Sequence, residues 1–224
     1  LPMPLVSLGT GSGQHGDVTN ATATWLQVGG SGIDTAYIYD DEASIAAGVK
    51  AVGASWSSIF LTTKIPCTTT QAAKADVASN LRSLGVGRVD LLLIHSPRPW
   101  RGDTSRCSVA ETWAVLEEAQ AAGQARSIGV SNFRIADLEM LAATAKVRPA
   151  VNQCSHSVSY HDDATAAYCE QRGIVYEAYS PLCGGANGSS CDHGSVLSIP
   201  LVQSIAMAHG VGPPVRRERD CDRS

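Results

Sequence analysis

Residues 32–39 read GIDTAYIY, an apolar stretch with a carboxylate, Asp34, inside it and a phenol, Tyr39, just past it. In a parallel α/β protein such a stretch is typical of a buried strand, and the residues after it form the loop at the strand's C-terminal end. Barrel enzymes build their active sites at that edge of the sheet. Asp34 and Tyr39 are therefore candidate catalytic residues.

Three later apolar stretches have the same form, and each delivers a reactive or polar group at its end. IFLTTK ends in Lys64, VDLLLIH ends in His95, and RSIGVSN ends in Ser131 and Asn132. Because the C-terminal ends of parallel strands meet at one edge of a sheet, we expect these side chains to lie on one rim.

Strand and helix patterns alternate along the whole chain. The predicted strands cover residues 4–10, 32–38, 59–64, 89–95, 125–131, 149–153 and 174–179, and the predicted helices cover residues 17–28, 42–52, 70–84, 108–121, 135–145, 162–171 and 196–209. This alternation predicts a parallel sheet with right-handed crossovers. Seven strand–helix units with polar groups at successive strand ends favour a (β/α)8 barrel over an open sheet. No glycine-rich phosphate fingerprint follows a strand, since residues 9–13 (GTGSG) are not followed by glycine at the fingerprint's third position, where Gln14 stands, and its acidic residue is also lacking.

Composition excludes several classes of protein. The 224 residues suit one large domain or two small ones, and the net charge of −4 gives no basic surface for nucleic acid. No apolar stretch approaches the roughly 18–20 residues of a membrane span, and no secretion signal is visible. The seven cysteines have no metal-binding spacing, so we expect no metal site and, in a cytoplasmic protein, reduced thiols at Cys67, Cys154 and Cys169. Cys183 and Cys191 flank a Gly/Ser-rich loop and are able to pair, although nothing in the sequence requires it.

Six motifs carry a resemblance to a known family. DTAYIYDDE, FLTTK, DLLLIHSP, ARSIGVSNF, PAVNQ and VYEAYSPL, in this order, resemble the aldo-keto reductases, and the match covers residues 4–209. The resemblance implies a (β/α)8 TIM barrel that reduces aldehydes or ketones to alcohols by hydride transfer. It implies NADPH/NADP+ as cofactor, with NADH as a possible substitute, and a small carbonyl compound as substrate.

The resemblance also assigns catalytic roles. It makes Tyr39 the proton donor, Lys64 the neighbouring cation, Asp34 the carboxylate that pairs with Lys64, and His95 the residue that polarises the substrate carbonyl. Tyr39 and His95 are thus also the expected substrate-binding residues. A free tyrosine has a pKa of about 10, so it is a poor acid at neutral pH unless a nearby charge stabilises its phenolate. Taken singly, each residue also has a purely structural interpretation; the six motifs in order favour the catalytic one.

The expected cofactor contacts follow from the same motifs. By resemblance, Ser131, Asn132 and Gln153 hold the nicotinamide carboxamide and Tyr179 stacks on the nicotinamide ring. The remaining expected cofactor contacts are Ser180 and Leu182 at the pyrophosphate, Thr10 after the first strand, and Asp34. His156, His161, His193 and His209 match no motif, and we interpret them as structural or surface residues.

Two positions depart from the family pattern in the expected substrate pocket. Gly11 and Ser96 stand where the family commonly has tryptophan. We therefore expect a wider and less aromatic pocket.

The largest departure is at the C-terminal end. After residue 211 the sequence reads GPPVRRERDCDRS, without apolar periodicity. We expect a barrel domain over residues 1–210 that lacks the eighth strand and final helix of the family, and a disordered tail over residues 211–224. A truncation, an alternative splice and a shifted reading frame all remain open as its origin. Two alternatives to a reductase also remain open: a non-catalytic, cofactor-binding regulatory barrel, and an inactive truncated product.

Overall fold

The computed structural model describes residues 1–11, 17–99, 106–158, 160–182, 196 and 199–210. The chain divides into two compact units, one of residues 1–154 and 162–179 and the other of residues 155–161 and 180–224. Residues 211–224, predicted to form a separate tail, lie outside the described part, so that division stays a prediction. In the second unit, helix α7 (Pro200–Ala208) begins four residues later than residue 196, the predicted start, with Pro200 in its first turn. Proline suits that position because the N–H it lacks has no partner inside the helix.

The first unit is built on one sheet whose strand order follows the chain. Its described strands are β1 (Leu8–Gly9), β2 (Gly32–Asp34), β3 (Phe60–Ile65), β4 (Val89–Ile94), β5 (Ala125–Ser131), β6 (Val151–Ser155) and β7 (Val175–Tyr179). β1 to β6 pair in parallel, and β7 completes the order, with Val175 N–H donating to the Ala150 carbonyl just before β6. The predicted parallel sheet with neighbouring consecutive strands is confirmed.

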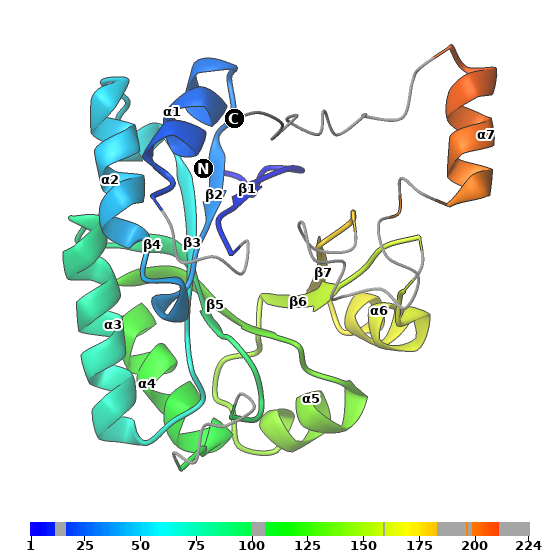
Figure 1. Cartoon of the computed structure of the whole chain (residues 1–224). Helices are drawn as coiled ribbons and strands as arrows, with labels where there is room; N and C mark the ends of the chain where they lie inside the picture. The colour runs from blue at the N-terminus through cyan, green and yellow to red at the C-terminus, as the bar shows by residue number, and fades with distance from the viewer. Residues whose placement is uncertain (12–16, 100–105, 159, 183–195, 197–198, 211–224) are drawn as a thin grey trace, which may run out of the picture. The chain divides into compact units, whose positions relative to one another are not determined.

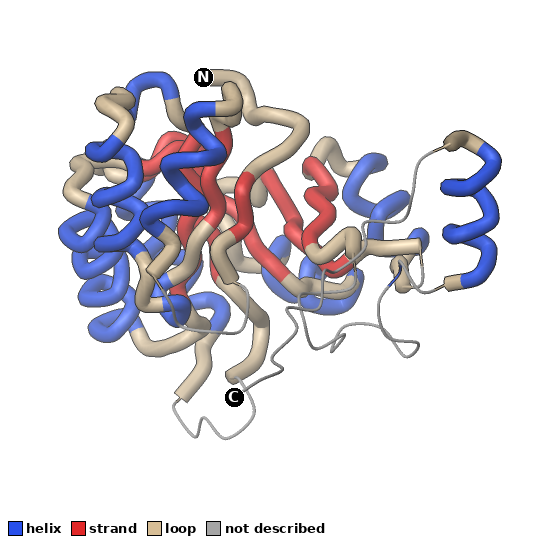
Figure 2. Tube along the Cα trace, turned by 45° about the horizontal axis from the view of Figure 1, so that its top comes forward, coloured by secondary structure: helices blue, strands red, loops and turns tan. Residues whose placement is uncertain are grey.

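Helices separate the strands and cover the outside of the sheet. They are α1 (Thr19–Gln27), α2 (Glu42–Ala51), α3 (Thr70–Leu84), α4 (Val109–Ala121), α5 (Ile135–Ala142) and α6 (Asp163–Gln171). Figure 1 shows α2, α3 and α4 side by side along β2 to β5, and Figure 2 shows the strands inside a layer of helices. This arrangement is that of a (β/α)8 barrel, of which the described residues contribute seven strands.

Both faces of β2, β3 and β4 are buried, as expected in a barrel, whereas β1 and β7 contain no buried residue. Alternate residues of β4 enter different apolar clusters. Leu92 and Ile94 join the large cluster between sheet and helices, whereas Leu91 and Leu93 join a small cluster with Phe60 and Val151 on the other face. Strands buried on both faces read as continuous apolar stretches, which is why they were visible in the sequence.

The strand predicted from residue 32 to just before Tyr39 ends four residues early, at Asp34, whereas Tyr39 follows the strand as predicted. β2 ends at Asp34, and Tyr37–Tyr39 forms a 3₁₀ turn closed by the Tyr39 N–H, which donates to the Ala36 carbonyl. The Thr35 hydroxyl donates to Asp41 at 2.6 Å, and Asp40 adopts a left-handed conformation with φ 53°. These local bonds compete with strand pairing and turn the chain at the rim.

Smaller errors lie at element ends. The predicted strand 4–10 contains only Leu8–Gly9, because Leu5 and Val6 are exposed and gain nothing from pairing. Asp17 was expected to cap α1; its carboxylate accepts from the Thr19 N–H at 2.8 Å, but Val18 occupies the cap position. The expected cap at Asp162 is confirmed by its bond from the Thr165 N–H at 3.0 Å.

The prediction of reduced thiols is wrong for one pair, since Cys67 and Cys107 form a disulfide with their Cα atoms 5.0 Å apart. Cys67 follows β3 and Cys107 precedes α4, and the two loops meet because β3 and β4 are neighbours. Cys154 and Cys169 are free, as predicted, while Cys183 and Cys191 lie outside the described residues. No helix among the described residues is both long and apolar enough to cross a membrane.

Candidate active site

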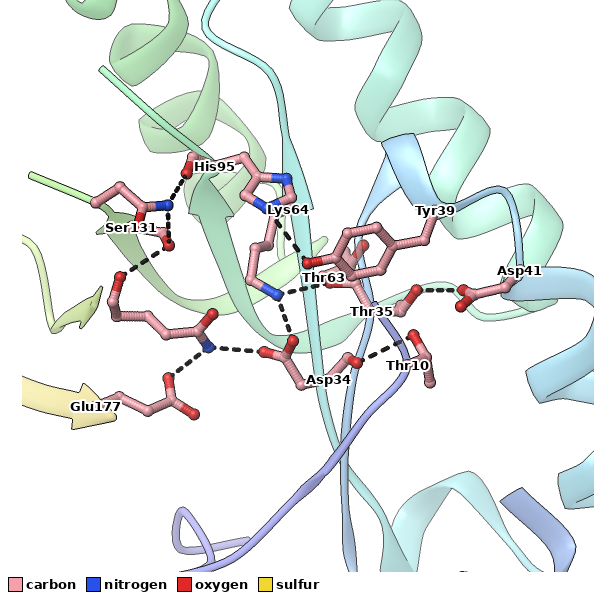
Figure 3. Close-up of polar contacts among 12 residues, drawn as sticks. Thr10, Asp34, Thr35, Tyr39, Asp41, Thr63, Lys64, His95, Ser131 and Glu177 are labelled. Carbon is pink, nitrogen blue, oxygen red and sulfur yellow. Dashed lines mark hydrogen bonds and ion pairs between the residues drawn. The ribbon is translucent and has the colours of Figure 1, made fainter. Parts of the chain in front are cut away.

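The C-terminal ends of the strands bring the predicted catalytic residues together. Asp34 is the last residue of β2, Lys64 is the second-to-last residue of β3, and His95 directly follows β4. Tyr39 reaches the same place from the 3₁₀ turn after β2 (Figure 3). On α3, Asn80 donates to the Thr63 hydroxyl at 2.9 Å and to the Lys64 carbonyl at 3.3 Å, which fixes this end of β3.

Lys64 and Asp34 form an ion pair inside the protein. The Lys64 ammonium donates to Asp34 Oδ1 and, at 3.1 Å, to the Thr35 carbonyl, and Lys64 is only 1% exposed. Burial alone would lower the pKa of Lys64, but the charges of Asp34 and Tyr39 and the hydrogen bond to Asp34 raise it overall. Lys64 therefore stays charged, as a buried ammonium does when it is paired.

Tyr39 lies against His95 and Lys64. Its hydroxyl is 3.4 Å from His95 Nε2, the two rings meet edge to face at 5.5 Å, and Lys64 Nζ lies 5.4 Å from the centre of the Tyr39 ring. Burial raises the pKa of the Tyr39 phenol more than Lys64 lowers it. The phenol is thus protonated at neutral pH, which is the state that a proton donor needs.

His95 is neutral in this environment. Burial, and next the charge of Lys64, lower its pKa to about 3. Asn132 holds the His95 backbone, because its side-chain amide donates to the His95 carbonyl at 2.8 Å. A neutral imidazole with its proton on Nε2 is able to donate a hydrogen bond to a carbonyl oxygen without carrying a charge.

The three residues expected to hold a carboxamide also lie together. Ser131 Oγ donates to the Gln153 carbonyl at 2.8 Å, and Asn132, in a left-handed conformation with φ 63°, donates its amide also to Ser131 Oγ at 3.1 Å. The Tyr179 hydroxyl donates to Asn132 Oδ1 at 2.8 Å. This network joins the ends of β5, β6 and β7.

The other predicted cofactor residues are less informative. Thr10 donates from both its N–H, at 3.0 Å, and its hydroxyl, at 3.3 Å, to the Asp34 carbonyl. Ser180 and Leu182 belong to the second unit; Ser180 has φ 53° and Leu182 is exposed. Their roles at the cofactor stay predictions.

Gly11 lies directly against Tyr39. A Cβ atom at Gly11 would be 2.4 Å from Tyr39 Cζ and 2.7 Å from its hydroxyl oxygen. Any side chain there would force the phenol to move, so this departure from the family pattern sets where Tyr39 lies. The expected wider pocket stays a prediction.

One residue of the network was not predicted. Glu177 in β7 accepts from Gln153 Nε2 at 2.9 Å, and Gln153 Nε2 also donates to Asp34 Oδ2 at 2.8 Å (Figure 3). The available signal was a charged residue inside an apolar strand, two positions before Tyr179 and hence on the same face. No group of three or more His, Cys, Asp or Glu side chains able to hold a metal occurs in the described part of the chain.

Comparisons with known proteins agree with this geometry. The Aldo/keto reductase family model matches residues 6–192. The chain is 35% identical to a D-galacturonate reductase of Hypocrea jecorina, over 95% of the chain and 73% of the relative. It is 32% identical to a glycerol 2-dehydrogenase (NADP(+)) of Saccharomyces cerevisiae, over 94% and 73%. The chain therefore belongs to the aldo/keto reductase family.

Solved structures lead to the same family. An aldo-keto reductase of Bombyx mori in complex with NADP superimposes with a TM-score of 0.81 at 28% identity, over 93% of this chain and 73% of the other. An aldo/keto reductase from Brucella melitensis gives 0.79 at 31% identity, over 93% and 75%. The predicted (β/α)8 fold of aldo-keto reductase type is confirmed.

Proposed function

We propose that this chain is an NADPH-dependent reductase that converts an aldehyde or ketone to an alcohol. The observation that carries the proposal is a protonated phenol, Tyr39, held beside a buried ammonium, Lys64, and a neutral imidazole, His95. The same three groups are those that carbonyl reduction requires: a proton donor, a charge that stabilises the donor's conjugate base, and a donor to the carbonyl oxygen.

The residues that would hold a nicotinamide cofactor fit it chemically. Gln153 Oε1 accepts no hydrogen bond within the described residues, although both protons of the same amide are used. An acceptor of this kind suits the N–H of a carboxamide. Ser131 and Asn132 are its neighbours, and Tyr179, tied by its hydroxyl to Asn132, would support the ring.

In the proposed mechanism, a bound reduced nicotinamide supplies the hydride to the carbonyl carbon. His95 Nε2–H donates to the carbonyl oxygen and orients it. Tyr39 gives its proton to the alkoxide as negative charge develops on that oxygen. Lys64, kept charged by Asp34, stabilises the Tyr39 phenolate that remains, so the barrier to proton transfer falls.

The test is Tyr39→Phe, assayed with NADPH and a small aldehyde by the loss of reduced-nicotinamide absorbance. We expect kcat to fall by about 10²–10⁴-fold, the usual effect of losing a general acid, with NADPH affinity almost unchanged. Tyr37→Phe is the matched control, because Tyr37 lies in the same turn but is 39% exposed. A Tyr39→Phe protein with near wild-type kcat would refute the assignment.

The same assay distinguishes a reductase from the main alternative, a non-catalytic cofactor-binding module. A wild-type chain that binds NADPH but reduces no aldehyde or ketone in a broad panel would be a cofactor-binding module rather than a reductase. The buried Lys64–Asp34 pair argues against that outcome, because a paired charge beside a phenol is costly to bury and is useful chiefly for proton transfer.

A further inference from the structure

The side-chain amide of Gln153 is held by two carboxylates from different strands. Its Nε2 donates one proton to Asp34 Oδ2 at 2.8 Å and the other to Glu177 Oε2 at 2.9 Å. Asp34 comes from β2 and Glu177 from β7, so the amide bridges distant parts of the sheet. Gln153 is only 4% exposed, and its bond to Asp34 is buried, whereas its bond to Glu177 is partly buried.

Because the Gln153 amide faces two acceptors, Asp34 Oδ2 and Glu177 Oε2, its NH₂ group must point toward them and its Oε1 away from them. With its amide flipped, Gln153 would place Oε1 against Asp34 Oδ2 and Glu177 Oε2, and these two carboxyl oxygens would lose their amide donor. Asp34 forms an ion pair with Lys64 through Oδ1 and accepts from Gln153 through Oδ2, so the side of the amide that faces Asp34 is the NH₂ group. Glu177 supplies the second bond that opposes rotation.

The consequence is a fixed hydrogen-bond acceptor in the candidate cofactor site. The Ser131 hydroxyl donates to the Gln153 backbone carbonyl. The side-chain amide of Asn132 donates to the His95 backbone carbonyl and to Ser131 Oγ. Gln153 Oε1 has no such bond within the described part of the chain. The polar group that Gln153 offers a ligand is thus an acceptor, close to two carboxylates.

We propose that Glu177 is a positioning residue that fixes Gln153 and thereby selects the carboxamide form of the pyridine cofactor against its carboxylate form. The carboxamide has N–H groups to donate to Gln153 Oε1. The carboxylate of a nicotinic-acid dinucleotide has acceptors alone and a negative charge, so it would meet an unpaired acceptor, Gln153 Oε1, beside the carboxyl groups of Asp34 and Glu177. This inference rests on the proposed function, since it concerns the same cofactor site.

The decisive measurement is a pair of affinities. NADP+ and its nicotinic-acid analogue are titrated against NADPH, followed by the fluorescence of the reduced nicotinamide. We expect wild type to bind the analogue at least about 10²-fold more weakly than NADP+, because a site built to hydrogen-bond an N–H strongly rejects a ligand that lacks it. Equal affinity of wild type for both forms would overturn the inference and leave the proposed reductase function standing.

Variants at residue 177 show whether Glu177 is responsible. In Glu177→Leu we expect the ratio of the two affinities to fall about tenfold, the value of one charge-assisted hydrogen bond. Glu177→Gln keeps an acceptor for Gln153 and should recover part of the ratio, which a purely structural role would not predict. Glu170→Leu, on the exposed side of α6, is the control and should keep the full ratio. An unchanged ratio in Glu177→Leu would overturn the assignment.

A second measurement needs no cofactor. In ¹⁵N-glutamine-labelled protein, the Gln153 amide protons, assigned by their loss in Gln153→Met, should exchange slowly with solvent, and faster in Glu177→Leu than in wild type. Unaltered exchange in a folded Glu177→Leu protein would contradict the positioning role. If wild type bound neither dinucleotide, the proposed function and the selection would both fail, whatever the exchange rates.

Discussion

At the scale of single residues, the site holds one positive charge and keeps its histidine neutral. The positive charge is the Lys64 ammonium. Burial of His95 and the charge of Lys64 both lower the pKa of His95. Asp34 is the carboxylate that pairs with Lys64, and burial, followed by the charge of Asp34, raises the pKa of Glu177. His95, the proposed donor to the substrate carbonyl, is thus uncharged, and Tyr39 is the one of these two residues that would give up a proton in the reaction.

Neutral His95 predicts a loss of stability in acid. Its pKa is about 3 in the folded state and 6.5 in a model peptide, so between these values the unfolded chain binds more protons. Stability is therefore complete above the unfolded pKa and declines as pH falls toward 3, by up to roughly 1.4 kcal/mol per pH unit. Urea unfolding at several pH values would measure it.

The control for this prediction is the slope in His95→Gln, which removes the titrating group. The free energy of unfolding of His95→Gln should fall less steeply with decreasing pH than that of wild type. His209→Gln, at an exposed position after α7, should keep the wild-type slope. Equal slopes in wild type and His95→Gln would show that His95 is protonated without cost in the folded protein.

At the scale of elements, the Cys67–Cys107 disulfide joins the loops that follow β3 and β4 at the catalytic rim. The two cysteines are 40 residues apart in the chain. Closing a loop of that length in the unfolded state stabilises the folded protein by about 2–4 kcal/mol. We expect reduction to lower the free energy of urea unfolding by that amount, with the disulfide mapped by mass spectrometry beforehand.

Two variants make the disulfide experiment specific. Cys67→Ser should resemble reduced wild type and show no further response to reductant. Cys154→Ser should still respond, because Cys154 is a free thiol. If the midpoint of wild type were the same with and without reductant, the two loops would not be linked in solution.

Elements with clear local signals were predictable. α3 (Thr70–Leu84) and β5 (Ala125–Ser131) have the predicted bounds, because the first has a clean apolar face followed by Gly85 and the second is a continuous buried strand. The turn at Tyr37–Tyr39 was not predictable, since its sequence is as apolar as a strand. Side-chain bonds of Thr35 and Asp41 decide it, and apolar periodicity does not report such bonds.

At the scale of the whole molecule, the candidate site was predictable where a residue ends its own strand. Asp34, Lys64 and His95 were found in that way, and the fold then brought them together. The Gln153–Glu177 contact and the disulfide were not found, because each joins two elements by a pairing that the sequence of either one does not encode. Their discovery required the order of strands in the sheet.

Cofactor preference is testable in a polypeptide of these 224 residues alone, which spans about 73% of the length of the D-galacturonate reductase and the glycerol 2-dehydrogenase compared above. Cofactor affinity sums contacts to nicotinamide, pyrophosphate and the adenosine 2′-phosphate. The family resemblance assigns residues of this chain to the first two contacts, and we expect the third to depend on the family's C-terminal segment, which residues 211–224 do not resemble.

Each charge-assisted bond to a phosphate contributes roughly 1.5–3 kcal/mol, so two missing bonds would cost about 10²–10⁴-fold in affinity. NADPH and NADH differ only in the 2′-phosphate. We therefore expect this polypeptide to bind NADPH weakly and with little preference over NADH, as measured by fluorescence titration of both. Tight binding with a strong NADPH preference would mean that residues within 1–224, such as the arginines of RRERDCDRS, bind the phosphate instead.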